Sequence, residues 1–240
     1  HLLESTIIAQ VDNLASAAQL IMGEADEGMP VVIIRGYNYQ KIEREHIDKI
    51  IRASESDIFQ NVNREEIINT LFDRRSYKHR FSSQKVKRRL IENCINIARY
   101  APNAHNRQQW RYIILEKGKI REELIDAMNQ KLVQDLQNDG KSQKFIQTKV
   151  NRTRANFLEA PYLVLISLER EELETYPDQR RNELEFQLGV QSVSASATYF
   201  LLALESKGLA ACWYCAPLFA QEQVKNPLNL PRSFVPMAFI

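Results

Sequence analysis

A basic segment at residues 74–78, with the sequence Arg-Arg-Ser-Tyr-Lys, carries the densest set of anion-binding groups in the chain. Its two guanidinium groups, one hydroxyl and one ammonium can surround the oxygens of a phosphate ester and a neighbouring polyol chain. The longer run 74–89 holds eight Lys and Arg residues, a composition that also fits a nucleic-acid patch or a solvated helix face. We predict that the first half of this run binds a phosphate.

A loop at residues 101–109, followed by Trp110, concentrates side-chain amides, among them those of Asn106, Gln108 and Gln109. Amides offer paired donors and acceptors, which can hydrogen-bond to the edge of a flat heterocycle beside an indole. An ordinary polar loop has the same composition, so composition alone leaves both interpretations open.

The chain has three cysteines, of which Cys212 and Cys215 have the Cys-x-x-Cys spacing of zinc and redox sites. A structural zinc site needs four ligands, and the sequence has neither a second Cys pair nor a His-x-x-His to complete the set. We therefore predict buried structural thiols and no metal. Three cysteines cannot form a disulfide framework, which is typical of a reducing compartment, so we expect a cytoplasmic protein.

Composition argues against several other classes. The chain has 32 Lys plus Arg and 30 Asp plus Glu, a net charge of +2, so no overall field favours nucleic acid or an anionic membrane. No apolar stretch reaches the roughly 18 to 20 residues needed to cross a bilayer. None of the 7 glycines is placed for a Gly-x-Gly-x-x-Gly or Walker loop, so side chains or helix N-termini must hold any phosphate. The histidines lack the arrangement of a Ser-His-Asp triad, so we assign none of them to nucleophilic catalysis, and the sequence identifies no catalytic residue.

The spacing of apolar residues predicts the elements that must position these groups. Helices are predicted over 9–22, 63–73, 84–101, 119–137, 143–159, 179–207 and 221–225. Strands are predicted at 31–34, 110–116, 162–167, directly after Gly208, and at 234–240. This order indicates an α+β fold in which helices pack on a modest sheet. The alanine-rich helix at 179–207 has few polar positions, so we expect it to contribute to a dimer interface as well as to the core.

Three motifs together resemble the nitroreductase family of FMN-dependent oxidoreductases. They are the basic segment at 74–78, Ala-Pro-x-x-x-Asn-x-Gln-x-Trp at 101–110, and Gly-Leu-x-x-Cys-Trp at 208–213. Their order and spacing match as well, over about residues 64 to 240. The resemblance implies a nitroreductase-like fold, with a modest mixed sheet flanked by helices. It also implies a homodimer that binds FMN in clefts between its subunits.

Carried over residue by residue, the resemblance assigns the FMN phosphate and ribityl chain to a phosphate clamp made of Arg74, Arg75, Ser76 and Lys78. It places Asn106 and Gln108 near the isoalloxazine ring, in what we call the flavin loop (residues 103–109). Cys215 and Ala216 stand where family members often bring backbone N–H groups to flavin N5.

The first 36 residues resemble the tail of the coenzyme F-420 γ-glutamyl ligase family, through segments at 12–18 and 31–36. We therefore predict a ligase-like tail at 1–36, a connecting arm at 37–62 and a nitroreductase-like domain at 63–240. The chain begins without an initiator Met and stops before the segment where the family supplies another basic phosphate ligand. We expect a longer gene product, with a truncated C-terminus.

The two resemblances side by side are the layout of two-domain proteins of coenzyme F-420 biosynthesis. They imply that hydride transfer from flavin N5 reduces a dehydro-precursor of this deazaflavin. Two alternatives stay open: a general NAD(P)H-dependent nitro or quinone reductase, and a non-redox deazaflavin-binding module that assists glutamyl transfer. A deazaflavin substrate carries a phosphodiester and a carboxylate and so needs a second anion site, for which the candidates are Arg107, Lys149, Arg152 and Arg154.

Overall fold

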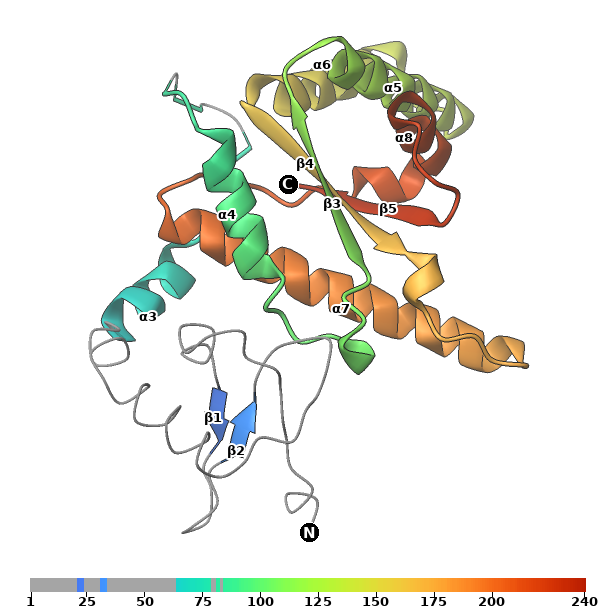
Figure 1. Ribbon diagram of the computed structural model, residues 1–240. Helices are drawn as coiled ribbons and strands as arrows, with labels where there is room; N and C mark the ends of the chain where they lie inside the picture. The colour runs from blue at the N-terminus through green and yellow to red at the C-terminus, as the bar shows by residue number, and fades with distance from the viewer. Residues whose placement is uncertain (1–20, 24–30, 34–63, 79–80, 83) are drawn as a thin grey trace. The chain divides into compact units, whose positions relative to one another are not determined.

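The structure is a computed structural model of the 240-residue chain. It describes residues 21–23, 31–33, 64–78, 81–82 and 84–240 (Figure 1). The chain divides into two compact units, His1–Ile68 and Asn69–Ile240. None of the helices in these described ranges is long and apolar enough to cross a bilayer.

In the first unit, the structure describes two short strands, β1 (Ile21–Gly23) and β2 (Val31–Ile33), which pair antiparallel. The strand predicted at 31–34 is thereby confirmed. The helix predicted over 9–22 is wrong at its last two residues, because their backbone groups pair with β2 instead of closing a helical turn. The rest of that helix and the connecting arm at 37–62 lie outside the described residues.

The second unit is built on a three-stranded sheet in the order β3-β4-β5, in which both strand pairs are antiparallel (Figure 1). The strands are β3 (Trp110–Glu116), β4 (Tyr162–Glu169) and β5 (Phe234–Phe239). The central strand β4 is buried along all but its first residue. A strand that is buried on both faces has a continuous apolar sequence, and this pattern is why β4 could be predicted from the sequence.

Helices cover both faces of this sheet, α4 and α7 on one face and α5, α6 and α8 on the other (Figure 1). Their bounds are α3 Arg64–Asp73, α4 Arg88–Ala98, α5 Lys119–Asn138, α6 Gln143–Glu159, α7 Gln179–Ser206 and α8 Gln221–Leu228. Strand β4 contributes side chains to both cores, because successive residues of a strand point to opposite faces of the sheet. Ile166 and Leu168 pack with α4 and α7, whereas Leu163 and Leu165 pack with α5, α6 and α8.

Two predicted elements of the second unit differ most from the structure. Helix α4 begins at Arg88 and not at residue 84, because the preceding segment is extended and the Val86 carbonyl accepts a hydrogen bond from the Tyr162 hydroxyl at 3.1 Å. The strand predicted directly after Gly208 is wrong. Residues 209–215 make only single bridges to two different partners, Ser76 in parallel and Phe239 in antiparallel orientation, so no continuous ladder forms. The bridge to Ser76 is the only parallel pairing recorded among the described residues. The α+β fold is therefore confirmed, but its named strands form an antiparallel sheet and not the predicted mixed sheet.

A buried arginine joins α5 to the C-terminus of α6, a feature that the sequence analysis missed. Arg121 is 1% exposed, and its guanidinium donates to the carbonyls of Phe157 at 2.8 Å, Ala160 at 2.9 Å and Pro161 at 3.4 Å. The Phe157 and Ala160 carbonyls are among those that the end of a helix leaves unpaired, and they carry the negative end of the helix dipole. Burial lowers the pKa of Arg121 to about 10, so the side chain stays charged at neutral pH.

Candidate functional site

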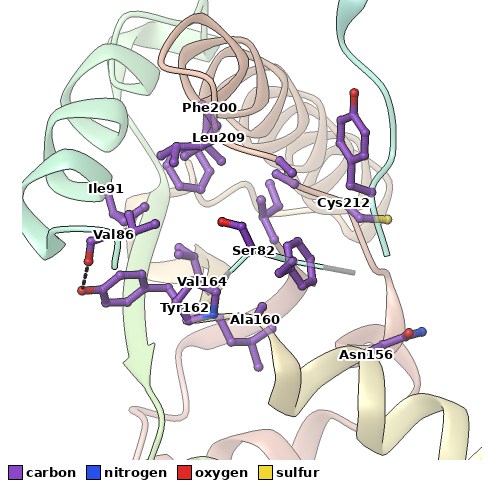
Figure 2. A pocket seen from close by; sticks show the side chains of 18 of the residues that line it. Ser82, Val86, Ile91, Asn156, Ala160, Tyr162, Val164, Phe200, Leu209 and Cys212 are labelled. Carbon is purple, nitrogen blue, oxygen red and sulfur yellow. Dashed lines mark hydrogen bonds between the residues drawn. The ribbon is translucent and has the colours of Figure 1, made fainter. Parts of the chain in front are cut away.

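The phosphate clamp lies in an extended segment that pairs with a residue outside the three-stranded sheet. Ser76 forms its parallel bridge with Ala211, and the Tyr77 amide donates to the Ala211 carbonyl at 3.0 Å. In an extended chain, neighbouring side chains point to opposite sides. Ser76 and Lys78 therefore share one side, whereas Tyr77 on the other side lines a pocket (Figure 2); all three residues are exposed.

Within the clamp, Arg75 has a role that its sequence position did not predict. Its guanidinium donates to the backbone carbonyls of Phe72 and Arg74, the latter at 2.9 Å. Phe72 belongs to the last turn of α3, so this side chain binds carbonyls that the helix end leaves free. Arg74 is half-buried. Ser76 and Lys78 are thus the members whose side chains are most accessible to an anion.

The flavin loop has an unusual backbone. His105, Asn106 and Gln108 all have positive φ angles, of 54°, 52° and 50°. This left-handed conformation costs roughly 1 to 2 kcal/mol for a residue with a side chain, so the surrounding structure must enforce it. Asn106 and Gln108, the two residues predicted to contact the flavin, are therefore held in place by specific contacts.

Three hydrogen bonds fix the loop. The Asn103 side chain accepts from the Gln108 amide at 2.9 Å, and Arg111 donates to the Gln108 carbonyl at 3.2 Å. The buried Ser192 hydroxyl on α7 accepts from the Ala104 amide at 3.0 Å. Ser192 was not predicted from the sequence, although a serine on an apolar helix, with Ser196 one turn later, indicates a polar contact inside the core.

The structure separates the phosphate clamp from the flavin loop. Ser192 anchors the loop near the middle of α7, whereas the clamp pairs with a segment beyond the end of that helix at Ser206. The 14 intervening helical residues span about 21 Å. The sheet indicates a similar distance between the phosphate clamp and the flavin loop. The loop immediately precedes the first residue of β3, and the clamp lies beyond the opposite end of β4. One chain therefore does not bring these two predicted parts together.

The four residues predicted to form a second anion site are also dispersed. Arg107 pairs with Glu174 and Arg154 pairs with Asp126. The Lys149 ammonium lies over the Phe145 ring at 5.4 Å from its centre, and Arg152 is exposed without a described carboxylate partner. Arg107 precedes β3, while the other three lie on α6, which ends beside the start of β4. Among the described residues, no group of three or more His, Cys, Asp or Glu is placed to hold a metal ion.

Comparison with protein families gives two matches along the chain. A model described as the nitroreductase family matches residues 71–240, and a model described as F420-0:gamma-glutamyl ligase matches residues 1–36. The first match contains the phosphate clamp, the flavin loop and all of the three-stranded sheet.

Two curated relatives cover different parts of the chain. Coenzyme F420:L-glutamate ligase of Methanothermobacter thermautotrophicus is 46% identical over 59 residues, which cover 24% of this chain and 23% of that enzyme. The chain thus spans about a quarter of the length of that relative. Iodotyrosine deiodinase of Thermotoga neapolitana is 28% identical over 168 residues, which cover 69% of this chain and 82% of the deiodinase.

A solved structure of a nitroreductase-like family protein from Bacillus cereus superposes with a TM-score of 0.55 at 19% identity, covering 72% of this chain and 82% of that one. At this identity the likeness shows the fold alone, and the fold is the nitroreductase-like fold that the sequence predicted.

Proposed function

The chain belongs to the nitroreductase family, and from this premise we propose that it is an FMN-dependent oxidoreductase of coenzyme F-420 biosynthesis that reduces a dehydro-precursor of the deazaflavin. The observation that carries the proposal is the order of the two family matches, a ligase-like segment at 1–36 upstream of a nitroreductase domain at 71–240. An enzyme of general detoxification has no need of this neighbour.

The described residues suit FMN. An exposed ammonium and hydroxyl, Lys78 and Ser76, stand beside the Arg74 guanidinium and can donate charge-assisted hydrogen bonds to a phosphate dianion. Asn106 and Gln108 offer amide donors and acceptors on a preformed loop, which suits the edge of a flat ring. When bound, FMN would supply hydride chemistry at its N5 atom.

The separation of about 21 Å between the clamp and the loop supports a site shared by two subunits. In such a homodimer the clamp of one subunit and the loop of its partner hold the same flavin. Helix α7 offers apolar surface for the contact, because Leu184, Leu188 and Tyr199 are 49%, 38% and 40% exposed. These side chains would be covered in a dimer, which matches the interface role predicted for this helix.

Thiol labelling tests where the flavin ring lies. Cys215 is exposed, so the prediction of buried thiols is wrong for this residue, whereas Cys94 and Cys212 are buried. Burial raises the pKa of the Cys94 thiol. We expect a disulfide reagent to label Cys215 rapidly in the folded protein and the other two only after unfolding. Saturating FMN should slow the labelling of Cys215 at least about tenfold if the ring covers that segment. An unchanged rate with FMN bound would place the ring elsewhere.

The substrate is tested with the chemically reduced, FMN-loaded chain under anaerobic conditions. We expect the dehydro-precursor to reoxidise the flavin and to gain two hydrogens by mass spectrometry, one delivered as hydride and one taken up as a proton. Nitroarenes and quinones in the same assay represent the general reductase. Fast turnover of these compounds, together with no binding of either the oxidised or the dehydro deazaflavin, would contradict the biosynthetic role. Binding without any turnover would favour a non-redox binding module.

A further inference from the structure

The segment that follows β4 lies beside the flavin loop, because β3 and β4 are antiparallel. Trp110, the first residue of β3, pairs with Leu168 near the end of β4. The Glu169 amide donates to the Gln109 carbonyl at 2.7 Å, which extends this pairing by one residue. Residues 169–174, which we call the acidic segment, have the sequence Glu-Arg-Glu-Glu-Leu-Glu. The pairing therefore brings four carboxylates close to the flavin loop.

Arg111 of β3 connects the acidic segment to the backbone of the flavin loop. Its Nη2 atom donates to the Glu172 carboxylate at 2.6 Å, although Glu172 lies 61 residues further along the chain. Its Nη1 atom donates to the carbonyls of Trp110 at 3.1 Å and Gln108 at 3.2 Å. A guanidinium has its donors in a fixed planar fork, so one side chain can bind the carboxylate and the carbonyls together.

The Gln108 peptide is held at both its donor and its acceptor. Its amide donates to the Asn103 side chain at 2.9 Å, and its carbonyl accepts from Arg111. Gln108 has a φ angle of 50°, in the left-handed region that residues with a side chain disfavour. Asn103 immediately precedes the 3₁₀ turn of the same loop, whereas Arg111 belongs to the sheet. Arg111 is therefore the contact that ties this strained residue to the rigid part of the fold.

Arg107 does not have this role, although it lies within the flavin loop. Its guanidinium pairs with Glu174 of the acidic segment, and among the described residues it donates to no backbone carbonyl. The two ion pairs are similarly exposed, with side chains at 36% and 43% for Arg107 and Glu174, and at 35% and 40% for Arg111 and Glu172. They form a matched pair in which only Arg111 reaches the loop backbone.

We propose that Arg111 is a positioning residue of the cofactor site and that Glu172 orients it. This inference rests on the proposed function, because it takes Gln108 as a residue that contacts the flavin ring. The two side chains keep the Gln108 peptide in its left-handed conformation before FMN binds, so that the Gln108 amide is already directed for binding. They act through the Gln108 carbonyl and not by contact with FMN. Neither of them lines the pocket shown in Figure 2.

The first test measures the FMN dissociation constant of variants of the full chain by flavin fluorescence. Arg111→Met should raise it about tenfold, because an unrestrained residue other than glycine favours the right-handed conformation by roughly that factor. Glu172→Ala leaves Arg111 without its orienting partner and should raise the constant about threefold, as expected for a partly exposed ion pair. Glu174→Ala removes the matched carboxylate and should leave FMN affinity unchanged.

The second test follows backbone amide exchange in the absence of FMN. In Arg111→Met, the Gln108 amide should exchange about tenfold faster, while the amides of the β3–β4 ladder should exchange as in the unaltered chain, because the loss is local. A general structural role would accelerate exchange in both places. Glu172→Ala should show the same local change at smaller size, which keeps the test decisive if thermal melting shows that Arg111→Met does not fold.

Arg111→Lys separates charge from geometry. Lysine keeps the positive charge but lacks the planar fork, so this variant should recover only part of the FMN affinity. The proposal is overturned by full affinity in Arg111→Lys, by unchanged affinity in Arg111→Met, or by equal losses in Glu172→Ala and Glu174→Ala. Failure of the unaltered chain to bind FMN would instead contradict the proposed function, and the two failures are therefore distinguishable.

Discussion

Replacing Lys78 or Arg74 with alanine should weaken FMN binding at least about tenfold, since each change removes a charge-assisted hydrogen bond of about 1.5 to 3 kcal/mol to the phosphate. The measurement is the FMN dissociation constant of each variant, from flavin fluorescence at low protein concentration. The larger loss is expected for Lys78, whose side chain is exposed, than for the half-buried Arg74.

Lys85→Ala is the matched control, because Lys85 is an exposed cation of the same basic run outside the phosphate clamp. It should bind FMN as the unaltered chain does. Equal, small losses in all three variants would mean that general positive charge, rather than the clamp, attracts the cofactor. Undiminished FMN retention in both clamp variants would refute the assignment.

Arg121→Met should destabilise the chain by about 3 kcal/mol or more, because it leaves the buried carbonyls at the end of α6 without donors, each worth about 1 to 3 kcal/mol. For a domain of this size the melting temperature should fall by roughly 6 to 12 °C. The folded pKa of Arg121, about 10, is well above neutrality, so this loss should not vary with pH near neutrality. Differential scanning calorimetry of both proteins measures it.

Two other substitutions define the cause of that loss. Lys119→Met alters a side chain that is 87% exposed, two residues away in the same first turn of α5, and should change the melting temperature little. Arg121→Lys retains the charge but lacks the planar fork that reaches several carbonyls, so it should recover only part of the stability. Full recovery with lysine would show that charge, and not the hydrogen bonds, stabilises the helix end.

Local sequence patterns predicted most elements of the second unit. The turn at 138–140 separated two helices correctly, and the apolar run at 162–167 identified the central strand. Patterns failed where distant residues decide the structure. The segment 209–215 pairs with partners far away in the sequence, and the carbonyls that Arg121 binds lie 36 to 40 residues beyond it.

The candidate site shows the same limit. Residue types were sufficient to propose the phosphate clamp and the flavin loop, because guanidinium, hydroxyl and amide groups have a definite binding chemistry. Their separation depends on the length of α7 and on the order of the strands, which no local motif encodes. The sequence also did not predict that Arg75 binds a carbonyl at the end of α3 or that Arg107 pairs with Glu174.

The backbone of the flavin loop bears on how this chain would respond to selection for heat resistance. At His105, Asn106 and Gln108, glycine would adopt the same backbone angles without steric penalty. Each of these three side chains opposes folding at its position. Directed evolution for heat resistance is therefore expected to accept glycine at these positions first and to lose cofactor affinity as it does so.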